Sequence, residues 1–305
     1  MSWSTSDIPD LTGRRALVTG ATSGLGYETA LELLRHGAGV TIAARNPEKS
    51  DQAAAKLAAA TGKTPEILAL DLSDLHGVET AVEQFGKTND SLDLLVNNAG
   101  VMAPPYRQTA DGFELQMGTN HLGHFALTAR LLPLLLKTSS PRVVTVSSFM
   151  HKTVSTVSQT DFRAEQVYAK WDAYGKSKLA NLLFMLELDR RARAAGANLT
   201  SVASHPGYAR THLQSSGPAL DGANLESRIL GFGTKLVAQS AAAGAWPSLY
   251  GATAPDVRSG SYYGPSLFEL RGKPKLVQPT KAAKNPELAQ RLWAWSVEAT
   301  GVDAF

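Results

Sequence analysis

The chain has 305 residues, of which 43% are hydrophobic and 19% charged, and its formal net charge is +3. This composition excludes a disordered chain, because it holds enough apolar residues to form a core. The absence of cysteine excludes disulfides, zinc–thiolate sites, iron–sulfur clusters and a cysteine nucleophile, and it agrees with a cytoplasmic protein. Acidic and basic residues are mixed along the chain, so no nucleic-acid partner is predicted. We expect neither a signal peptide nor a membrane span, because the apolar runs are too short.

Short aliphatic runs, bounded by polar residues, glycine or proline, recur through the first 200 residues and are typical of buried strands. They predict strands at Ala16–Thr19, Val40–Ala43, Ile67–Leu70, Leu94–Val96, Val143–Val146 and Leu199–Ala203. Helical patterns lie between them, at Leu25–His36, Pro47–Ala60, Leu75–Phe85, Gly112–Lys137 and Asp172–Ala195. This alternation predicts an α/β fold with a doubly wound parallel sheet and helices on both faces. The continuous apolar character of the strands predicts that both of their faces are buried.

The alternating pattern weakens after about residue 207. Residues 208–230 include a stretch rich in glycine, serine and proline, and we interpret them as a substrate loop or lid. A helix is expected from about Glu226 to Tyr250 and a last strand at Ser261–Tyr263. The C-terminal residues, about 285–305, are predicted to be helical, with an amphipathic helix over Glu287–Thr300. No change of composition divides residues 1–305, so one domain is predicted.

A glycine-rich loop follows the first predicted strand, with the sequence TGATSGLG over Thr19–Gly26. Glycines allow a tight turn and a close approach to a pyrophosphate, and the N-terminus of the next helix offers free N–H groups. The spacing is GxxxGxG, which differs from the GxGxxG of the standard dinucleotide fingerprint. Its place at the first strand–helix junction favours dinucleotide binding over a plain tight turn.

The end of the second predicted strand indicates which dinucleotide is bound. An acidic residue at this point would bind the adenosine ribose hydroxyls of NAD, but the chain has Ala44-Arg45-Asn46 here. Arg45 could pair with a 2′-phosphate through charge-assisted hydrogen bonds. We therefore predict NADP(H) rather than NAD(H); the alternative is that Arg45 is an ordinary solvated arginine.

A candidate acid/base pair opens the fifth predicted helix. Tyr174 and Lys178 are four residues apart and therefore share a helix face. Because an ammonium favours the phenolate, Lys178 is expected to lower the tyrosine pKa from about 10, so that the pair can exchange a proton with a carbonyl or alcohol. The Y-x-x-x-K pattern is common by chance, so other motifs have to support it. In chain order these are Asn97-Asn98-Ala99-Gly100, Asn120, Ser147-Ser148 and His205-Pro206-Gly207.

The order and spacing of these motifs resemble the short-chain dehydrogenase/reductase family over about residues 10–265. The resemblance implies a single Rossmann-type domain, a nicotinamide cofactor and hydride transfer to or from a carbonyl or alcohol carbon. It implies four catalytic residues: Tyr174 as the acid/base, Lys178 to lower its pKa and hold the nicotinamide ribose, Ser148 to bond the substrate oxygen, and Asn120 to anchor a water of the proton relay. The predicted cofactor-binding residues are Gly20, Thr22, Ser23, Gly24, Leu25, Gly26, Arg45, Asp71, Leu72, Asn98, Ala99, Gly100, Tyr174, Lys178, Pro206, Gly207 and Thr211.

Several of these residues also have a structural interpretation. Asn98, like Asn97, could tie down a strand end, Asn120 could bend its helix, and Asp71 could cap the next helix. Thr211 could bond its own loop instead of a ligand. Ser147 is interpreted as structural.

The long segment Phe149–Ala173 between Ser148 and Tyr174, and the strings Thr119–Phe125 and Ser177–Phe184, are similar to the retinol dehydrogenase-like and protochlorophyllide reductase-like branch of the family. This branch implies NADP(H) and a lipophilic or bulky carbonyl substrate. The chain departs from both named activities, because it has neither an N-terminal apolar anchor nor the pigment-site cysteine of the light-driven reductases.

Other residues are assigned to the substrate wall or to the core. The wall is expected from Met102, Tyr106, Phe149, Met150, Trp171, Tyr208, Leu213 and Leu220. No metal site is predicted: His121 and His124 lie three residues apart with no nearby acid or third histidine, so packing is favoured. His151 and His205 are also interpreted as structural. Trp293 and Trp295 are expected to pack in the core rather than at a subunit contact.

The sequence thus predicts an NADP(H)-dependent oxidoreductase of the EC 1.1.1 type, acting on a small carbonyl or alcohol substrate, with residues 1–305 as one dinucleotide-binding and catalytic domain. The alternatives are a non-catalytic NADP(H)-binding sensor and an epimerase or dehydratase on the same fold. The complete catalytic set argues against the sensor, and the absence of a GxxGxxG loop argues against the epimerase. The resemblance implies a homodimer or homotetramer, paired through the helices of Asn120 and Tyr174, although its branch includes monomers.

Overall fold

A single eight-stranded sheet forms the centre of the protein. The computed structural model describes residues 3–164, 168–208 and 239–305. The strands are β1 (Arg15–Thr19), β2 (Gly39–Ala44), β3 (Glu66–Ala69), β4 (Leu94–Asn97), β5 (Arg142–Val146), β6 (Thr200–Ser204), β7 (Tyr262–Leu267) and β8 (Arg271–Leu276). Their order in the sheet is β3-β2-β1-β4-β5-β6-β7-β8, and only the β7–β8 pair is antiparallel. The predicted α/β fold with a parallel sheet is confirmed.

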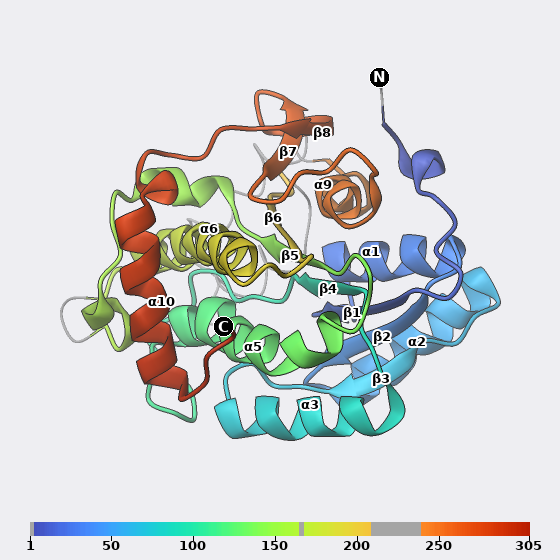
Figure 1. Ribbon diagram of the computed structural model, residues 1–305, viewed down its shortest axis with the longest axis horizontal. Coiled ribbons are helices and arrows are strands. Elements are labelled where there is room, and N and C mark those ends of the chain that lie inside the picture. Colours follow the sequence, from blue (N-terminus) through green and yellow to red (C-terminus); the bar gives the residue numbers. More distant parts are fainter. Residues whose placement is uncertain (1–2, 165–167, 209–238) are drawn as a thin grey trace.

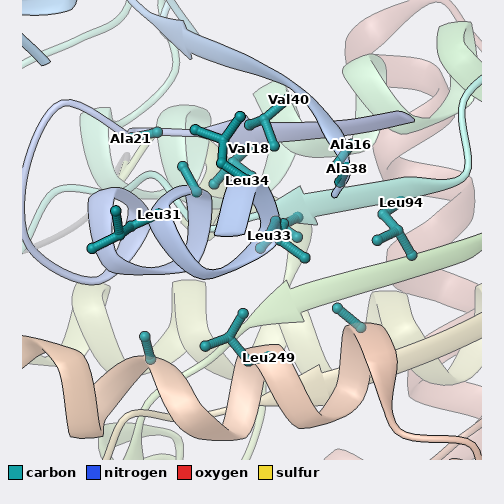
Figure 2. Close-up of a cluster of buried hydrophobic side chains, with 14 of the residues drawn as sticks. Ala16, Val18, Ala21, Leu31, Leu33, Leu34, Ala38, Val40, Leu94 and Leu249 are labelled. Atoms are coloured by element: carbon teal, nitrogen blue, oxygen red, sulfur yellow. The ribbon is translucent and has the colours of Figure 1, made fainter. Parts of the chain in front are cut away.

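Helices cover both faces of this sheet (Figure 1). One layer contains α1 (Gly24–Arg35), α2 (Pro47–Thr61) and α9 (Ala241–Thr253). The other contains α3 (Leu75–Thr88), α5 (Gly123–Leu135) and α6 (Lys170–Ala194), with α10 (Pro286–Thr300) outside it. Figure 2 shows part of the core between this first helix layer and the sheet, to which Leu33 of α1, Leu249 of α9 and Leu94 of β4 belong. In the described part of the chain, no helix is both long and apolar enough to cross a bilayer.

The predicted burial of every strand on both faces is wrong for β3. Only Leu68 is buried in this strand, and Ile67 is 42% exposed. The reason is position: β3 is the edge of the sheet next to β2, so it is covered less than the central strands.

The helix predicted at Gly112–Lys137 is interrupted. A short α4 (Leu115–Met117) leads into a π-helical turn, Gly118–Leu122, and α5 ends at Leu135. The turn is fixed from outside the helix, because the Asn120 side chain bonds both backbone groups of Val101. π-helical turns of this kind are rare in proteins, and many of those that occur lie at functional sites.

The C-terminal half also departs from the prediction. The last predicted strand forms a hairpin with a further strand, β8, which was not predicted. The sequence of β8, RGKPKL, is typical of a loop, because proline and glycine are rare in central strands. Pro274 is tolerated here since β8 is the other sheet edge. Of the helix expected at Glu226–Tyr250, the described part is α9. Residues 209–238, with Thr211, Leu213, Leu220 and most of the predicted lid, lie outside the described residues.

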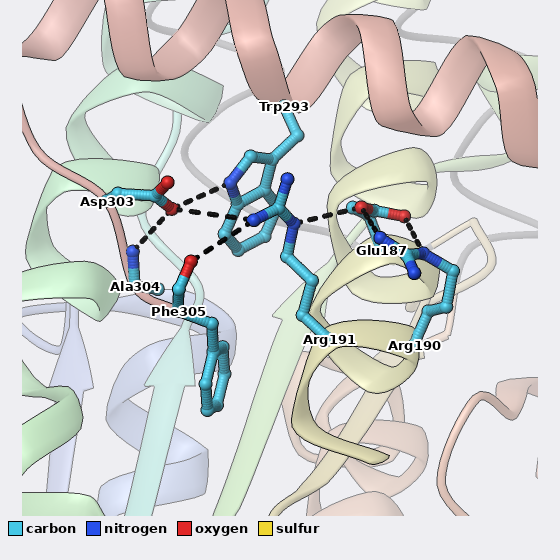
Figure 3. Close-up of polar contacts among 7 residues, drawn as sticks. All are labelled: Glu187, Arg190, Arg191, Trp293, Asp303, Ala304 and Phe305. Carbon is cyan, nitrogen blue, oxygen red and sulfur yellow. Dashed lines mark hydrogen bonds and ion pairs between the residues drawn. The ribbon is translucent and has the colours of Figure 1, made fainter. Parts of the chain in front are cut away.

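The C-terminal helix α10 packs into the core. Figure 3 shows the polar contacts that link its Trp293 and the last residues of the chain to Arg191 of α6. Trp293 is 2% exposed, stacks on Phe184 with ring centroids 5.9 Å apart, and donates its indole N–H to Asp303 at 2.9 Å. The Arg191 guanidinium of α6 lies 4.6 Å from the centre of the same ring and bonds the Phe305 carbonyl. The core interpretation of Trp293 is therefore confirmed, and Trp295 is partly buried. The chain's own C-terminus thus covers part of α6.

Candidate active site

A pocket of about 450 Å³ lies at the carboxyl ends of β1 to β4. The strand order reverses between β1 and β4, and open α/β sheets bind ligands in the crevice at such a point. Twelve of the predicted cofactor residues line this one pocket: Gly20, Thr22, Ser23, Gly24, Leu25, Gly26, Arg45, Asp71, Leu72, Asn98, Ala99 and Gly100.

The glycine loop has a shape that only glycine permits. Gly20 has a φ of +66°, and a Cβ on Gly26 would lie 2.5 Å from both the Gly20 carbonyl oxygen and the Asn98 amide nitrogen. Ser23 occupies the N-cap of α1, yet its side chain caps none of the helix N–H groups among the described residues. Asn46 and Asp74 do cap α2 and α3. The start of α1 therefore offers backbone donors and a positive dipole end to an anion, which fits a pyrophosphate.

The floor of the pocket includes a second cation that sequence analysis missed. Arg45, at the end of β2, is exposed and lines the pocket, and so does Lys49 in the first turn of α2. The Asn46 side chain accepts a hydrogen bond from the Lys49 backbone N–H and thereby fixes where α2 begins. The four-residue spacing of the two cations across a strand–helix junction is the signal that could have revealed Lys49.

The polar residues after β3 and β4 organise the pocket wall. The Asp71 carboxylate accepts hydrogen bonds from the Ser73 backbone and hydroxyl, whereas Asp74 caps α3, so the capping alternative for Asp71 is wrong. The Asn98 amide donates to the Thr19 carbonyl at 2.7 Å. Asn98 therefore does tie the ends of β1 and β4 together, and it lines the pocket as well.

The four predicted catalytic residues come from three elements next to this pocket. Tyr174 and Lys178 are both buried on α6, with the ammonium 5.7 Å from the centre of the tyrosine ring. Ser148 lies two residues after the end of β5 and interacts with Tyr174. A Cβ on Gly100 would lie 2.9 Å from Asn120 Oδ1 and 3.5 Å from Lys178 Nζ, so the pocket wall contacts the catalytic residues at Gly100.

The sequence predicted that Lys178 lowers the pKa of Tyr174, and this prediction is wrong for the protein without a bound cofactor or substrate. Burial raises the pKa of Tyr174 to about 12, with an opposing hydrogen-bond effect from Ser148. Burial also lowers the pKa of Lys178 to about 8. The Lys178 ammonium donates to the Val146 carbonyl at 3.2 Å and lies beside the tyrosine ring, so its charge is not directed at the phenolic oxygen. Desolvation is therefore the largest influence on the pKa of Tyr174, and the Ser148 hydrogen bond opposes it only in part.

The Asn120 amide is used by the protein itself. Its oxygen accepts from the Val101 N–H at 2.8 Å, and its nitrogen donates to the Val101 carbonyl and the Ser177 hydroxyl, both at 3.0 Å. The helix-bending interpretation thus agrees with these bonds, and the water-anchoring role stays a prediction. Ser147 donates to the Lys178 carbonyl at 2.8 Å, in keeping with a structural role.

The histidines near the site are buried and bonded. His124 bridges the Thr19 hydroxyl and the Asn120 carbonyl, and His121 bonds Ser296 of α10. Burial lowers the pKa of His121 to about 3 and that of His124 to about 4. These contacts are packing contacts, as the sequence predicted.

The loop after β6 is held by the C-terminal part of the chain. The Tyr208 N–H donates to the Leu270 carbonyl at 2.8 Å, and the Gln239 side chain donates to the Pro206 carbonyl at 2.6 Å. His205 accepts from the Gly207 N–H at 3.2 Å. Pro206 and Gly207 do not line the 450 Å³ pocket.

Comparisons with known proteins agree with this geometry. The family model described as short chain dehydrogenase matches residues 14–219. The mouse protein Retinol dehydrogenase 12 is 38% identical over 95% of this chain and 87% of its own length. Polyprenol dehydrogenase from mouse is 38% identical over 96% of this chain and 86% of its own length.

Solved structures extend the likeness to three dimensions. An uncharacterised protein from Mycobacterium paratuberculosis is similar over the whole of both chains, with a TM-score of 0.81 and 40% identity. A putative short-chain dehydrogenase from Shigella flexneri, solved in complex with NADP, has a TM-score of 0.63 and 27% identity over 83% of this chain and 97% of its own.

Proposed function

Because the chain belongs to the short-chain dehydrogenase family, and within it to the retinol dehydrogenase-like branch, we propose that it is an NADP(H)-dependent oxidoreductase of lipophilic carbonyl or alcohol compounds, with Tyr174 as its acid/base. The single observation that carries the proposal is the meeting of a nucleotide-shaped pocket with a buried Tyr–Lys pair beside Ser148. A sensor would need the pocket but not this buried pair.

The choice of NADP(H) rests on charge. Arg45 and Lys49 border the pocket at the end of β2, where the adenosine ribose of a bound dinucleotide would lie. A 2′-phosphate would pair with both, whereas a ribose hydroxyl would gain nothing from two cations. The Shigella relative, solved with NADP, has the same fold.

In the proposed reaction the protein's own side chains transfer the proton, and a nicotinamide cofactor, when bound, would supply or accept the hydride. With a pKa of about 12, Tyr174 holds its proton at neutral pH and can give it to a carbonyl oxygen that becomes an alkoxide. Ser148 is placed to donate to the same oxygen and stabilise its growing charge. Asn120 keeps the Val101 backbone and Ser177 in place around the pair.

A lipophilic substrate is supported by exposed aromatic residues at the predicted substrate wall. Tyr106, Phe149 and Trp171 are 45%, 41% and 36% exposed. The Trp171 ring also lies edge-on to the Tyr174 ring, with centroids 6.4 Å apart, so an exposed aromatic side chain reaches the proposed acid/base. The named relatives act on retinol and polyprenol, which are both lipophilic. A single domain over residues 1–305 and a cytoplasmic location remain parts of this proposal.

An assay of cofactor consumption tests the proposal. The purified protein is given NADPH or NADH together with aldehydes and ketones of increasing chain length and ring number, and absorbance at the reduced nicotinamide band is followed. We expect sustained oxidation of NADPH, a higher kcat/KM with NADPH than with NADH, and a KM that falls as the substrate becomes more apolar. Tight NADPH binding without turnover of any carbonyl would support the sensor instead. Conversion of a sugar or alcohol without net cofactor consumption would support the epimerase.

A further inference from the structure

The tip of the β7–β8 hairpin (Figure 1) is a tight two-residue turn. Phe268 and Glu269 have φ angles of +53° and +58°, and the Leu270 N–H donates to the Leu267 carbonyl at 3.0 Å. Positive φ at both central residues is what a type I′ hairpin turn requires, so the turn itself accounts for these angles. Phe268 at this turn is 90% exposed, whereas the Glu269 side chain contacts the rest of the protein.

Glu269 contacts the segment that carries Ser148. Its carboxylate pairs with the Lys152 ammonium at 2.8 Å, and both side chains are about one-quarter exposed. Lys152 lies in the short 3₁₀ helix Phe149–Thr153, which begins directly after Ser148. In the same helix the buried His151 ring bonds the Ser148 carbonyl at 2.7 Å. The position of Lys152 therefore affects the position of the Ser148 backbone, because both belong to this short helix and its N-cap.

The same carboxylate faces the loop after β6. Glu269 Oε2 lies 3.6 Å from Nε2 of His205, which is fully buried. Since His205 Nδ1 accepts the Gly207 N–H, the ring hydrogen is assigned to Nε2 and points toward the carboxylate. The neighbouring Leu270 carbonyl accepts from the Tyr208 N–H. The hairpin tip thus holds both ends of the predicted Pro206–Gly207 cofactor segment.

We propose that Glu269 is a positioning residue, whose carboxylate joins the Ser148 segment to the Gly207 loop and so sets the distance between the substrate-binding serine and the nicotinamide. The inference rests on the proposed function. The bond between the Glu269 carboxylate and the Lys152 ammonium is charge-assisted, and such bonds are stronger than neutral ones. His205 Nε2 has no hydrogen-bond partner within the described ranges and faces the same carboxylate at 3.6 Å, so this second contact is electrostatic and longer than a hydrogen bond. The hairpin turn places the carboxylate beside both groups.

Kinetics of Glu269→Gln and Lys152→Met test the proposal. Glu269→Gln should lower kcat/KM for the carbonyl substrate about tenfold, the size expected when a hydrogen bond to a charged group is lost. It should also raise the dissociation constant of NADPH about threefold, because the carboxylate that faces the His205 N–H loses its charge. Lys152→Met should affect the carbonyl kinetics and leave NADPH binding unchanged. The charge-exchanged variant Lys152→Glu/Glu269→Lys should recover part of the carbonyl kcat/KM.

Phe268→Gly is the matched control. It relieves the backbone strain and removes no buried side chain, so both kinetic constants should stay within a factor of about two while thermal stability rises. The proposal is overturned if Glu269→Gln lowers the unfolding temperature and leaves both constants unchanged, because the pair is then merely structural. If the wild type turns over no carbonyl, the proposed function fails, and the NADPH dissociation constants of the two variants still decide the role of Glu269.

Discussion

The β1–β4 half and the β5–β8 half of the sheet build the site by different means. In the first half, the pocket residues directly follow strand ends, and the backbone of the Thr19–Gly26 loop gives the pocket its shape. In the second half, the proposed reactive side chains lie on α6 and after β5, and distant segments contact their neighbours: the hairpin tip pairs with Lys152, and α10 bonds His121. Binding in the first half depends on backbone shape, whereas chemistry in the second depends on contacts between segments far apart in sequence.

The largest effect is expected in the second half, for Tyr174→Phe. The variant keeps the buried ring and loses the proton donor, so kcat should fall about 10³-fold or more, in the upper part of the range for general acid catalysis. NADPH binding, measured by fluorescence titration, should stay unchanged. Tyr250→Phe is the matched control: Tyr250 lies on α9 and its hydroxyl donates to Asp256, so kcat should not change. Turnover of Tyr174→Phe near the wild-type rate would contradict the acid/base assignment.

Gly26→Ala should have the next largest effect, and it acts on the first half. The new Cβ would lie 2.5 Å from the Gly20 carbonyl oxygen, so the loop has to shift and lose its fit to the pyrophosphate. We expect NADPH affinity to fall about 100-fold, equivalent to the loss of about two charge-assisted bonds. In the control Gly86→Ala, a Cβ in α3 meets nothing within 4 Å, and stability should rise by about 0.5–1 kcal/mol. Unchanged affinity in Gly26→Ala would separate this loop from the cofactor.

Arg45→Ala is expected to act on the same half, with a smaller and more selective effect. It removes one charge-assisted contact to a 2′-phosphate, so the affinity for NADPH should fall about tenfold while that for NADH stays the same. Lys49→Ala should also lower the affinity for NADPH and leave that for NADH unchanged. Lys56→Ala, a change further along α2 and away from the pocket, is the control for net charge. An equal loss for NADPH and NADH would show that the 2′-phosphate binds elsewhere.

The last effect concerns the contacts that join the two halves, and it bears on stability rather than on activity. His124 connects Thr19 of β1 with the Asn120 turn, and burial lowers its pKa to about 4 from an unfolded value of 6.5. Between these values the unfolded chain binds more protons than the folded one, so the free energy of unfolding falls as the pH drops from 6.5 toward 4, by about 1.4 kcal/mol per pH unit for such a group. His121 acts in the same direction.

Urea unfolding at several pH values between 7 and 4.5 measures this loss. His121→Gln should make the decline with falling pH shallower, because one group that resists protonation is removed. The control His76→Gln changes an exposed histidine of α3 and should leave the decline unaltered. A stability that does not depend on pH in this range would mean that these histidines are protonated in the folded protein.

The first half was predicted well because its signals are local. The positive φ of Gly20 and the start of α1 are encoded within a few residues, and parallel strands bring their carboxyl ends to one edge of the sheet. The exposure of β3 was missed since strand order cannot be derived from its own four residues. Lys49 was missed because its signal, the four-residue spacing from Arg45, indicates a binding role only once Arg45 is seen to border the pocket.

In the second half, the sequence identified Tyr174, Lys178 and Ser148 by pattern but not their electrostatics. The pKa of Tyr174 depends on how completely it is buried, which is decided by the elements packed around α6. The role of Glu269 depends on a hairpin whose second strand has the sequence of a loop.

By itself, then, the sequence determined the fold class and the candidates for the nucleotide loop and the reactive residues, because each depends on a short pattern of residue types. Only the tertiary structure decided the burial of the Tyr–Lys pair, the π-helical turn at Asn120 and the contacts of Glu269. These properties depend on desolvation and on contacts between residues 19 to 117 positions apart, and neither can be derived from any single segment of the chain.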